Sequence, residues 1–397
     1  MSETKKANFY RYSTYLYYFN KLFGLCAFHY NPFNRQFKES IPSIIYCLIL
    51  LLYTTIYCPN LIISFKDILE NTFSINLAIY IGLFHAALQL FSVVSVQYFN
   101  IYYRKRIIDY LNCKVIFEKK MNQFVPKIYR NRYFTTRAAT VIIVLIFKLI
   151  SHYVIMFFVT NQDTTMLIAL LFYMIPMAIT TLTGCNFAME IISFQYFTSQ
   201  INFSLYELVD QIKDVPKNTS SAQKMVLSCK ICDKLDEFSI LYSEMNIILT
   251  KFNKLETVIL LIYFFNKFIE LIVPTFFEYL SYVGFLKGEV TYEMMINGVI
   301  NDLFSGLELI MCVACCDRLM EEMATTGKIL HEFPIHKVDD RLKESISQFS
   351  IQILQEKRPI SLCGMFNVDN TLLYSMISSM TSYLILLIQF QLQGIGL

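Results

Sequence analysis

The sequence predicts an all-α membrane protein with seven transmembrane helices. Of its 397 residues, 55% are hydrophobic and only 16% are charged, whereas a soluble domain carries about 25% charged residues. The apolar residues are gathered in long blocks, and Lys and Arg are concentrated in every second connection between those blocks. The net charge of +3 is too small to indicate a nucleic-acid partner. The expected environment of the chain is therefore membrane lipid.

Seven segments are long enough to cross a bilayer as helices, which takes about 20 mostly apolar residues. The second segment contains no charged residue, while Asp302 and Glu308 interrupt the sixth. We expect the spans at 41–63, 73–99, 138–159, 165–188, 258–285, 293–316 and 366–390.

The distribution of Lys and Arg orients these spans, because cytosolic loops carry an excess of both residues. Thirty of the 34 Lys and Arg residues precede the first span or connect spans two and three, four and five, or six and seven. The N-terminus is therefore expected in the cytosol and the C-terminus outside the cell. Rhodopsin-like receptors have the opposite orientation, so a G-protein-coupled receptor is disfavoured.

The connections divide the chain into alternating membrane and cytosolic parts. We expect a cytosolic N-terminal segment at 1–40, transmembrane helices one to four at 41–188, cytosolic helical extensions at 189–257, transmembrane helices five and six at 258–316, a second cytosolic segment with its own helix at 317–365, the last transmembrane helix at 366–390 and an extracellular tail at 391–397.

The cytosolic segments carry apolar residues at helical spacing. One stripe runs over 197–212, a second repeats every 3.5 residues over 231–252 and leads directly into the fifth span, and a third covers 342–353. We expect a cytosolic helical bundle continuous with the spans. Packing in the core of one chain and contact with other subunits are both compatible with these stripes.

Charged residues inside spans are costly to bury and are usually paired or functional. Lys267 and Glu270 are three residues apart and can pair on one helix. Internal ion pairs and a role in a ligand pocket are the two interpretations of this set, which comprises Lys148, Lys267, Glu270, Glu278, Asp302 and Glu308.

The C-terminal region carries the most specific pattern in the chain. Residues 362–369 read Leu-Cys-Gly-Met-Phe-Asn-Val-Asp, and Ser382-Tyr383 is followed by five hydrophobic residues and then by Gln389-Phe390. This region resembles the C-terminal signature of the insect gustatory receptor family, which is related to the insect odorant receptors. Ser382 stands where the family has Thr, and it keeps the hydroxyl group.

The resemblance implies a ligand-gated cation channel in the plasma membrane of chemosensory neurons, opened by a small-molecule tastant. It implies a homotetramer, with assembly beside other gustatory receptors as the alternative. Four copies of the last span would line one pore, and the cytosolic helices would form a shared anchor. No cofactor, metal or catalytic residue is implied.

The resemblance also assigns residues to the pore. Gln389 and Phe390 would stand at its narrow outer part, with Ile385 and Leu386 one turn further in, where apolar rings can close a pore by dewetting. Ser382 lies on the polar side of this span, and hydroxyl groups suit a conducting surface. Tyr383 is expected to pack against neighbouring helices. Because residues 391–397 are uncharged, we expect poor ion selectivity.

The outer halves of spans two to six hold aromatic and polar residues that suit a small-molecule pocket. Packing in the helical core is the alternative role for each of them. The candidates are Tyr80, Phe84, His85, His152, Tyr153, Tyr173, Phe277, Tyr282, Asn297 and Asn301.

The ligand class stays open between a fructose-type sugar and a bitter compound. In the branch of the family that detects common sweet sugars, Glu follows the motif Tyr, but Leu384 stands there in this chain, so that branch is disfavoured.

A multi-pass secondary transporter is the alternative function. Transporters of that kind usually show internal repeats, and none is visible in this sequence.

No motif of a known enzyme class occurs in this sequence with the residue spacing that its catalytic site requires.

Overall fold

The protein is described here from a computed structural model. It covers residues 16–31, 34, 36–72, 76–124, 132–159, 164–216, 220–284, 292–334, 339–356 and 359–393. Long helices dominate this part of the chain, as the sequence predicts. The helices are α2 (Ile41–Thr72), α3 (Asn76–Tyr102), α4 (Arg104–Phe124), α5 (Arg132–Val159), α6 (Thr164–Lys213), α7 (Ser221–Val283), α8 (Tyr292–His331), α9 (Asp340–Glu356) and α10 (Asn370–Gln393).

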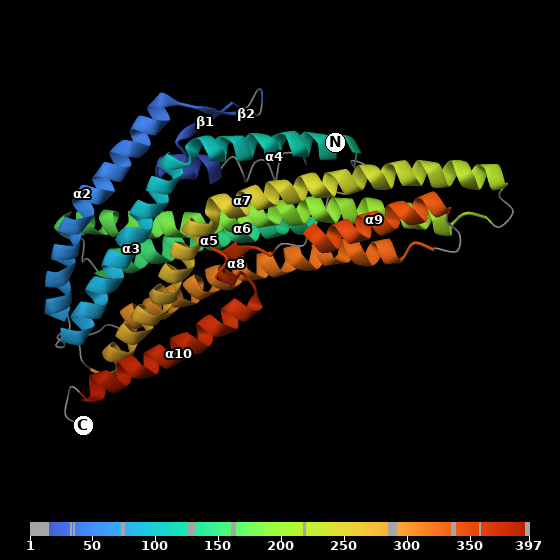
Figure 1. Ribbon diagram of the computed structural model, residues 1–397. Coiled ribbons are helices and arrows are strands. Elements are labelled where there is room, and N and C mark those ends of the chain that lie inside the picture. Colours follow the sequence, from blue (N-terminus) through green and yellow to red (C-terminus); the bar gives the residue numbers. More distant parts are fainter. Residues whose placement is uncertain are drawn as a thin grey trace.

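Two short antiparallel hairpins accompany the helices. Strands β1 (Phe28–Asn31) and β2 (Gln36–Glu39) follow a helical segment at 16–22, and β3 (Ser361–Leu362) and β4 (Phe366–Asn367) precede α10. Figure 1 shows α6, α7 and α8 side by side along the molecule, with α2 and α3 together at one end and α9 at the other.

Each of the seven predicted spans falls largely within one helix, namely α2, α3, α5, α6, α7, α8 or α10. Among the described residues, five helical segments are long and apolar enough to cross a membrane. They lie in α3, α6, α7, α8 and α10, and α2 adds a shorter apolar stretch at Ile41–Ile56. The prediction of an all-α membrane fold is confirmed, whereas the number and orientation of the spans stay predictions.

Two helices continue far beyond the length that a bilayer requires. α6 has 50 residues and α7 has 63, so α7 alone is roughly 95 Å long at 1.5 Å per residue. The α7 helix begins at the cap residue Ser220, whose hydroxyl accepts a hydrogen bond from the Gln223 amide, and ends at Gly284 with φ of 87°. Each of these helices is therefore long enough to continue from a predicted span into the predicted cytosolic bundle.

The three apolar stripes expected in the cytosolic segments are buried within the single chain. The stripe on α7 comprises Ile231, Leu235, Phe238, Tyr242, Met245, Leu249 and Phe252, all buried. The α9 stripe packs on α7, with the Tyr242 and Phe349 rings 5.7 Å apart in an edge contact. The Glu356 carboxylate on α9 accepts hydrogen bonds from Ser243 and Asn246 on α7. These polar contacts set the register between the two helices.

The α9 packing generates a stability prediction. Phe349 is buried against Tyr242, whereas Ile351 on the same helix is exposed. Phe349→Ala should lower the free energy of unfolding by about 3 to 5 kcal/mol, because it removes a buried ring and leaves a cavity. Thermal unfolding of the purified full chain in detergent measures this loss, with Ile351→Ala as the matched control. Equal melting temperatures for the two variants would contradict the α7–α9 packing.

Candidate functional site

The last helix, α10, is the span that its own chain covers least. Only 6% of the residues in its apolar stretch are buried, against 78% for α6. It lies against α7 and α8 along one side of the molecule (Figure 1). Its apolar contacts include Leu384, Leu387 and Ile388, which pack against the cluster around Phe276 and Leu280 on α7. The rest of its surface is left open in the single chain.

The residues that sequence analysis assigned to the pore lie on this open surface. The exposed residues are Ser382, Ile385, Leu386, Gln389 and Phe390. The Ser382 hydroxyl donates to the Ser378 carbonyl of its own helix at 3.1 Å, and so its oxygen can still accept a hydrogen bond from water. Tyr383 makes an edge contact with the Phe268 ring at 6.1 Å and is otherwise 54% exposed.

A tight turn connects α9 to α10 and contains the Cys363-Gly364 pair of the C-terminal motif. Cys363 and Gly364 have φ of 51° and 73°, and a positive φ favours glycine at the second position. The Thr257 hydroxyl on α7 donates to the Ser361 carbonyl and accepts from the Cys363 amide. The Asp369 carboxylate accepts from the Leu372 amide, as a helix N-cap does.

This turn also sets the start of the last helix. α10 begins at Asn370, four residues later than the predicted span, because Phe366 and Asn367 pair as strand β4. Thr257 was not among the site residues that the sequence indicated, since a lone Thr in a long helix carries no signal. Its contacts attach the base of α10 directly to α7.

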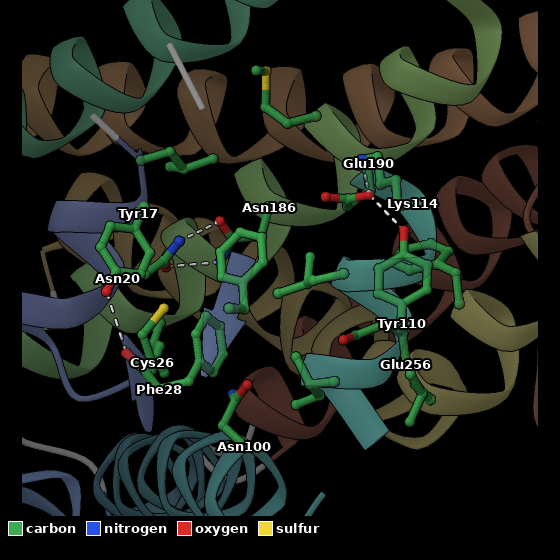
Figure 2. Close-up of a pocket in the computed structure, with 18 of the residues that line it drawn as sticks. Tyr17, Asn20, Cys26, Phe28, Asn100, Tyr110, Lys114, Asn186, Glu190 and Glu256 are labelled. Atoms are coloured by element: carbon green, nitrogen blue, oxygen red, sulfur yellow. Dashed lines mark hydrogen bonds and ion pairs between the residues drawn. The ribbon is translucent and has the colours of Figure 1, made fainter. Parts of the chain in front are cut away.

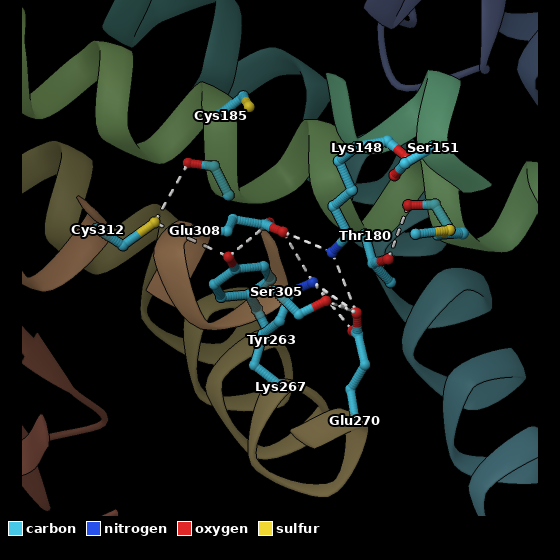
Figure 3. A network of polar contacts seen from close by, with 12 residues as sticks. Lys148, Ser151, Thr180, Cys185, Tyr263, Lys267, Glu270, Ser305, Glu308 and Cys312 are labelled. Carbon is cyan, nitrogen blue, oxygen red and sulfur yellow. Dashed lines mark hydrogen bonds and ion pairs between the residues drawn. The ribbon is translucent and has the colours of Figure 1, made fainter. Parts of the chain in front are cut away.

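Four charged side chains form a buried network between α5, α7 and α8 (Figure 3). The Lys148 ammonium on α5 lies 2.8 Å from the Glu308 carboxylate of α8 and 3.1 Å from the Glu270 carboxylate of α7. The Lys267 ammonium on α7 lies 2.9 Å from an oxygen of each of the same two carboxylates. Two cations and two anions thus neutralise one another.

Neutral side chains complete this network. The Tyr263 hydroxyl donates to Glu308 at 2.8 Å, and the Ser305 hydroxyl donates to Glu270 at 2.9 Å. A methyl group at Gly184 on α6 would collide with the Tyr263 hydroxyl and the Glu308 carboxylate. The absence of a side chain at this position therefore lets α6 pack directly against the network. For these four charged residues, internal pairing is the interpretation that the structure supports.

Charge balance in this network generates the next prediction. Glu308→Gln leaves two lysines with a single carboxylate and should lower the free energy of unfolding by about 3 kcal/mol or more, because an uncompensated buried charge remains. Adding Lys148→Met removes the excess charge, so the double variant should be more stable than Glu308→Gln. Thermal unfolding of the detergent-purified chain measures both. A double variant less stable than Glu308→Gln would contradict the pairing.

Four further buried polar atoms on α3, α7 and α8 lack a hydrogen-bond partner among the described residues. They are His85 Nε2 on α3, Glu278 Oε1 on α7, and Asn301 Oδ1 and Asp302 Oδ1 on α8. The Glu278 side chain lies directly over Gly298, one turn before Asp302 on the same helix. The other oxygen of Asp302 accepts from Thr275 at 3.2 Å. Buried polar groups are normally satisfied by protein, water or ligand.

The predicted pocket residues whose side chains the structure describes do not gather at one place in the single chain. Tyr80, Phe84 and Tyr282 are 70%, 55% and 82% exposed on the outer surface of the bundle. Phe277 is half-buried in the apolar cluster of α3 and α7, and only His85 and Asn301 present buried polar atoms. The side chains of four candidates, His152, Tyr153, Tyr173 and Asn297, lie outside the described residues.

The sequence named Glu278 and Asp302 as costly charges in spans and left internal pairing and a pocket role open for both. The contact of Glu278 with Gly298 and that of Asp302 with Thr275 depend on how α7 and α8 pack, which residue spacing alone does not reveal. Within the described part of the chain, no group of His, Cys, Asp and Glu residues has the arrangement of a metal site.

The family model described as 7tm chemosensory receptor matches residues 14–394. This chain therefore belongs to the 7tm chemosensory receptor family, and the resemblance seen in the C-terminal motif is confirmed.

Its relatives in Drosophila melanogaster are gustatory receptors. The chain is 24% identical to the gustatory receptor for bitter taste 93a over 43% of its own length, and the match spans 40% of that receptor. It is 34% identical to the gustatory receptor for sugar taste 43a over 22% of its own length and 21% of that receptor. With gustatory receptor 22d the identity is 22%, over 94% of this chain and 93% of that protein.

A solved structure shares the fold. The insect olfactory receptor OR5 from Machilis hrabei, determined in complex with eugenol, superposes with a TM-score of 0.61. The match covers 96% of this chain and 100% of that receptor at 12% sequence identity.

Proposed function

We propose that this protein is an insect taste receptor that acts as a tastant-gated, weakly selective cation channel. The observation that carries the proposal is the open surface of α10, which holds the family signature and which its own chain leaves largely uncovered. A helix with the exposed Gln389 amide on a membrane-crossing surface needs water or another subunit beside it, because lipid cannot satisfy that amide.

A homotetramer meets that need if four α10 helices surround one pore. Ile385 and Leu386 would then form apolar rings that close the pore by dewetting, and Gln389 and Phe390 would define its outer constriction. No residue from Asn370 to Leu397 is charged, so the proposed pore has no charged ring and discriminates poorly among cations. A mixed assembly with other gustatory receptors is the alternative to the homotetramer. The plasma membrane of chemosensory neurons is the proposed location.

The ligand pocket is proposed between the outer parts of α3, α7 and α8. Three of the four buried atoms without partners there are acceptor oxygens, on Glu278, Asn301 and Asp302. A ligand with several hydroxyl donors would satisfy them, which favours a fructose-type sugar over an apolar bitter compound. The fold is that of a receptor determined with a small molecule bound, eugenol.

The match to a chemosensory receptor family favours the receptor channel over the secondary transporter.

The pore assignment is tested by whole-cell current in cells that express only this chain, during perfusion with sugars and bitter compounds. Gln389→Ala should change the relative permeability of cations or the open fraction, because the amide would line the constriction. Gln348→Ala, an exposed residue on α9, is the matched control. Unchanged permeability and gating in Gln389→Ala would exclude the proposed constriction, and saturable tracer uptake without current would favour the transporter.

The pocket assignment is tested by the dose–response curve of the activating tastant. Asp302→Asn should raise the half-maximal concentration by about tenfold, since hydrogen bonds to charged groups contribute about 1.5 kcal/mol or more, while the maximal current stays unchanged. Asp236→Asn, on an exposed position of α7 far from the outer end, is the control. An unaltered half-maximal concentration in Asp302→Asn would remove this residue from the pocket.

A further inference from the structure

A second site lies at the opposite end of the spans from the proposed tastant pocket. A cavity of about 190 Å³ is lined by the helical segment 16–22, β1, β2, α3, α4, α6 and α7 (Figure 2). Its α7 residue Glu256 is 22 positions before Glu278, which corresponds to roughly 33 Å along the helix. Apart from Asn186, near the end of the predicted fourth span, its lining residues lie in the segments that the charge distribution places in the cytosol.

The walls of this cavity are mainly apolar. Leucine side chains and aromatic rings from five elements face it, and they would pack against a hydrocarbon or aromatic body. Examples are Leu16, Leu25, Phe28, Phe37, Phe252 and Leu255.

Most polar groups on the walls already have partners in the protein. The Asn20 and Asn186 amides donate to each other's carbonyl oxygen at 2.7 and 2.8 Å. The Glu190 carboxylate accepts from the Tyr110 hydroxyl at 2.6 Å and pairs with the Lys114 ammonium at 2.5 Å. The charge of Glu190 is therefore balanced by Lys114, the one cationic residue among those that line the cavity.

Glu256 is different from these groups. Its half-buried carboxyl faces the cavity in Figure 2, and no described residue forms a hydrogen bond or ion pair with it. Burial and the nearby Glu190 carboxylate raise the pKa of Glu256 to about 7. A carboxylate in such surroundings is stabilised by a counter-charge, because an unpaired charge is costly to remove from water.

We propose that this cavity binds a small organic ammonium ion, with its N–H groups donating to Glu256 and its apolar body packed among the leucine and aromatic side chains. An anion is disfavoured because it would meet the Glu256 carboxylate and find Lys114 already paired with Glu190. An inorganic cation such as Ca²⁺ takes six to eight oxygen ligands, which these apolar walls do not supply. The site is independent of the tastant pocket and of channel gating.

The proposal is tested by calorimetric titration of the purified full chain in nanodiscs with benzylammonium at pH 8. The wild type should bind it saturably. Glu256→Gln, which keeps the shape and removes the charge, should weaken binding by about tenfold or more. Glu237→Gln changes the same charge at an exposed position of α7 and should bind as the wild type does. Benzyl alcohol, the neutral analogue, should bind the wild type more weakly than benzylammonium.

The pH profile gives a second readout. Glu256 is charged above its pKa, so the affinity of the wild type should fall as the pH decreases from 8 to 6, whereas Glu256→Gln should show no such change. The other titratable groups on the walls are Tyr17, Cys26, Tyr110, Lys114 and Glu190. Burial raises the pKa of both tyrosines and of the Cys26 thiol, so these three stay neutral in that range.

Three results would overturn the proposal. They are the absence of saturable binding to the wild type, equal affinity in Glu256→Gln, and binding of benzyl alcohol as tight as that of benzylammonium. The comparison of the two ligands uses the wild type alone, so it decides the matter even if Glu256→Gln does not fold. None of these results depends on a current, and failure here is thus distinct from failure of the proposed channel.

Discussion

Two lysines and two glutamates, buried together between α5, α7 and α8, are the interaction on which the packing of the spans depends. Each ammonium group of Lys148 and Lys267 meets both carboxylates, and removal of any one charge leaves an excess that the surrounding protein cannot solvate. The need to keep the set neutral therefore holds these three helices in one arrangement. The close approach of α6 at Gly184 follows from the same cluster.

The helix α10 contributes no residue to this network. It contacts α7 and α8 through one apolar side and is attached at its base through Thr257, while its remaining surface stays open. A helix with few contacts to a rigid bundle can shift at a smaller energetic cost than the bundle itself. This arrangement suits the proposed function, in which α3, α7 and α8 bind the tastant and α10 moves to open the pore.

Much of the fold follows from residue patterns. The positions of the long apolar segments predicted where the membrane helices lie, and the stripe from Ile231 to Phe252 predicted a helix continuous with the fifth span, which α7 confirms. Periodicity is a local property, so a single sequence suffices to reveal it. The C-terminal motif likewise indicated the family, because Ser382-Tyr383 and Gln389-Phe390 stand close together in the chain.

The sequence by itself determined that this is an all-α membrane protein of the gustatory receptor type, with an uncharged last helix. Helix spacing also indicated the pairing of Lys267 with Glu270. Only the tertiary structure decided that Lys148 meets Glu308 across 160 residues, a separation that helix spacing cannot encode. It likewise placed Glu256 on the wall of a cavity and left Asp302 without a partner for one oxygen. The physical reason is that hydrophobic periodicity reports which face of a helix is buried, whereas the partner of a buried polar group depends on how whole helices cross.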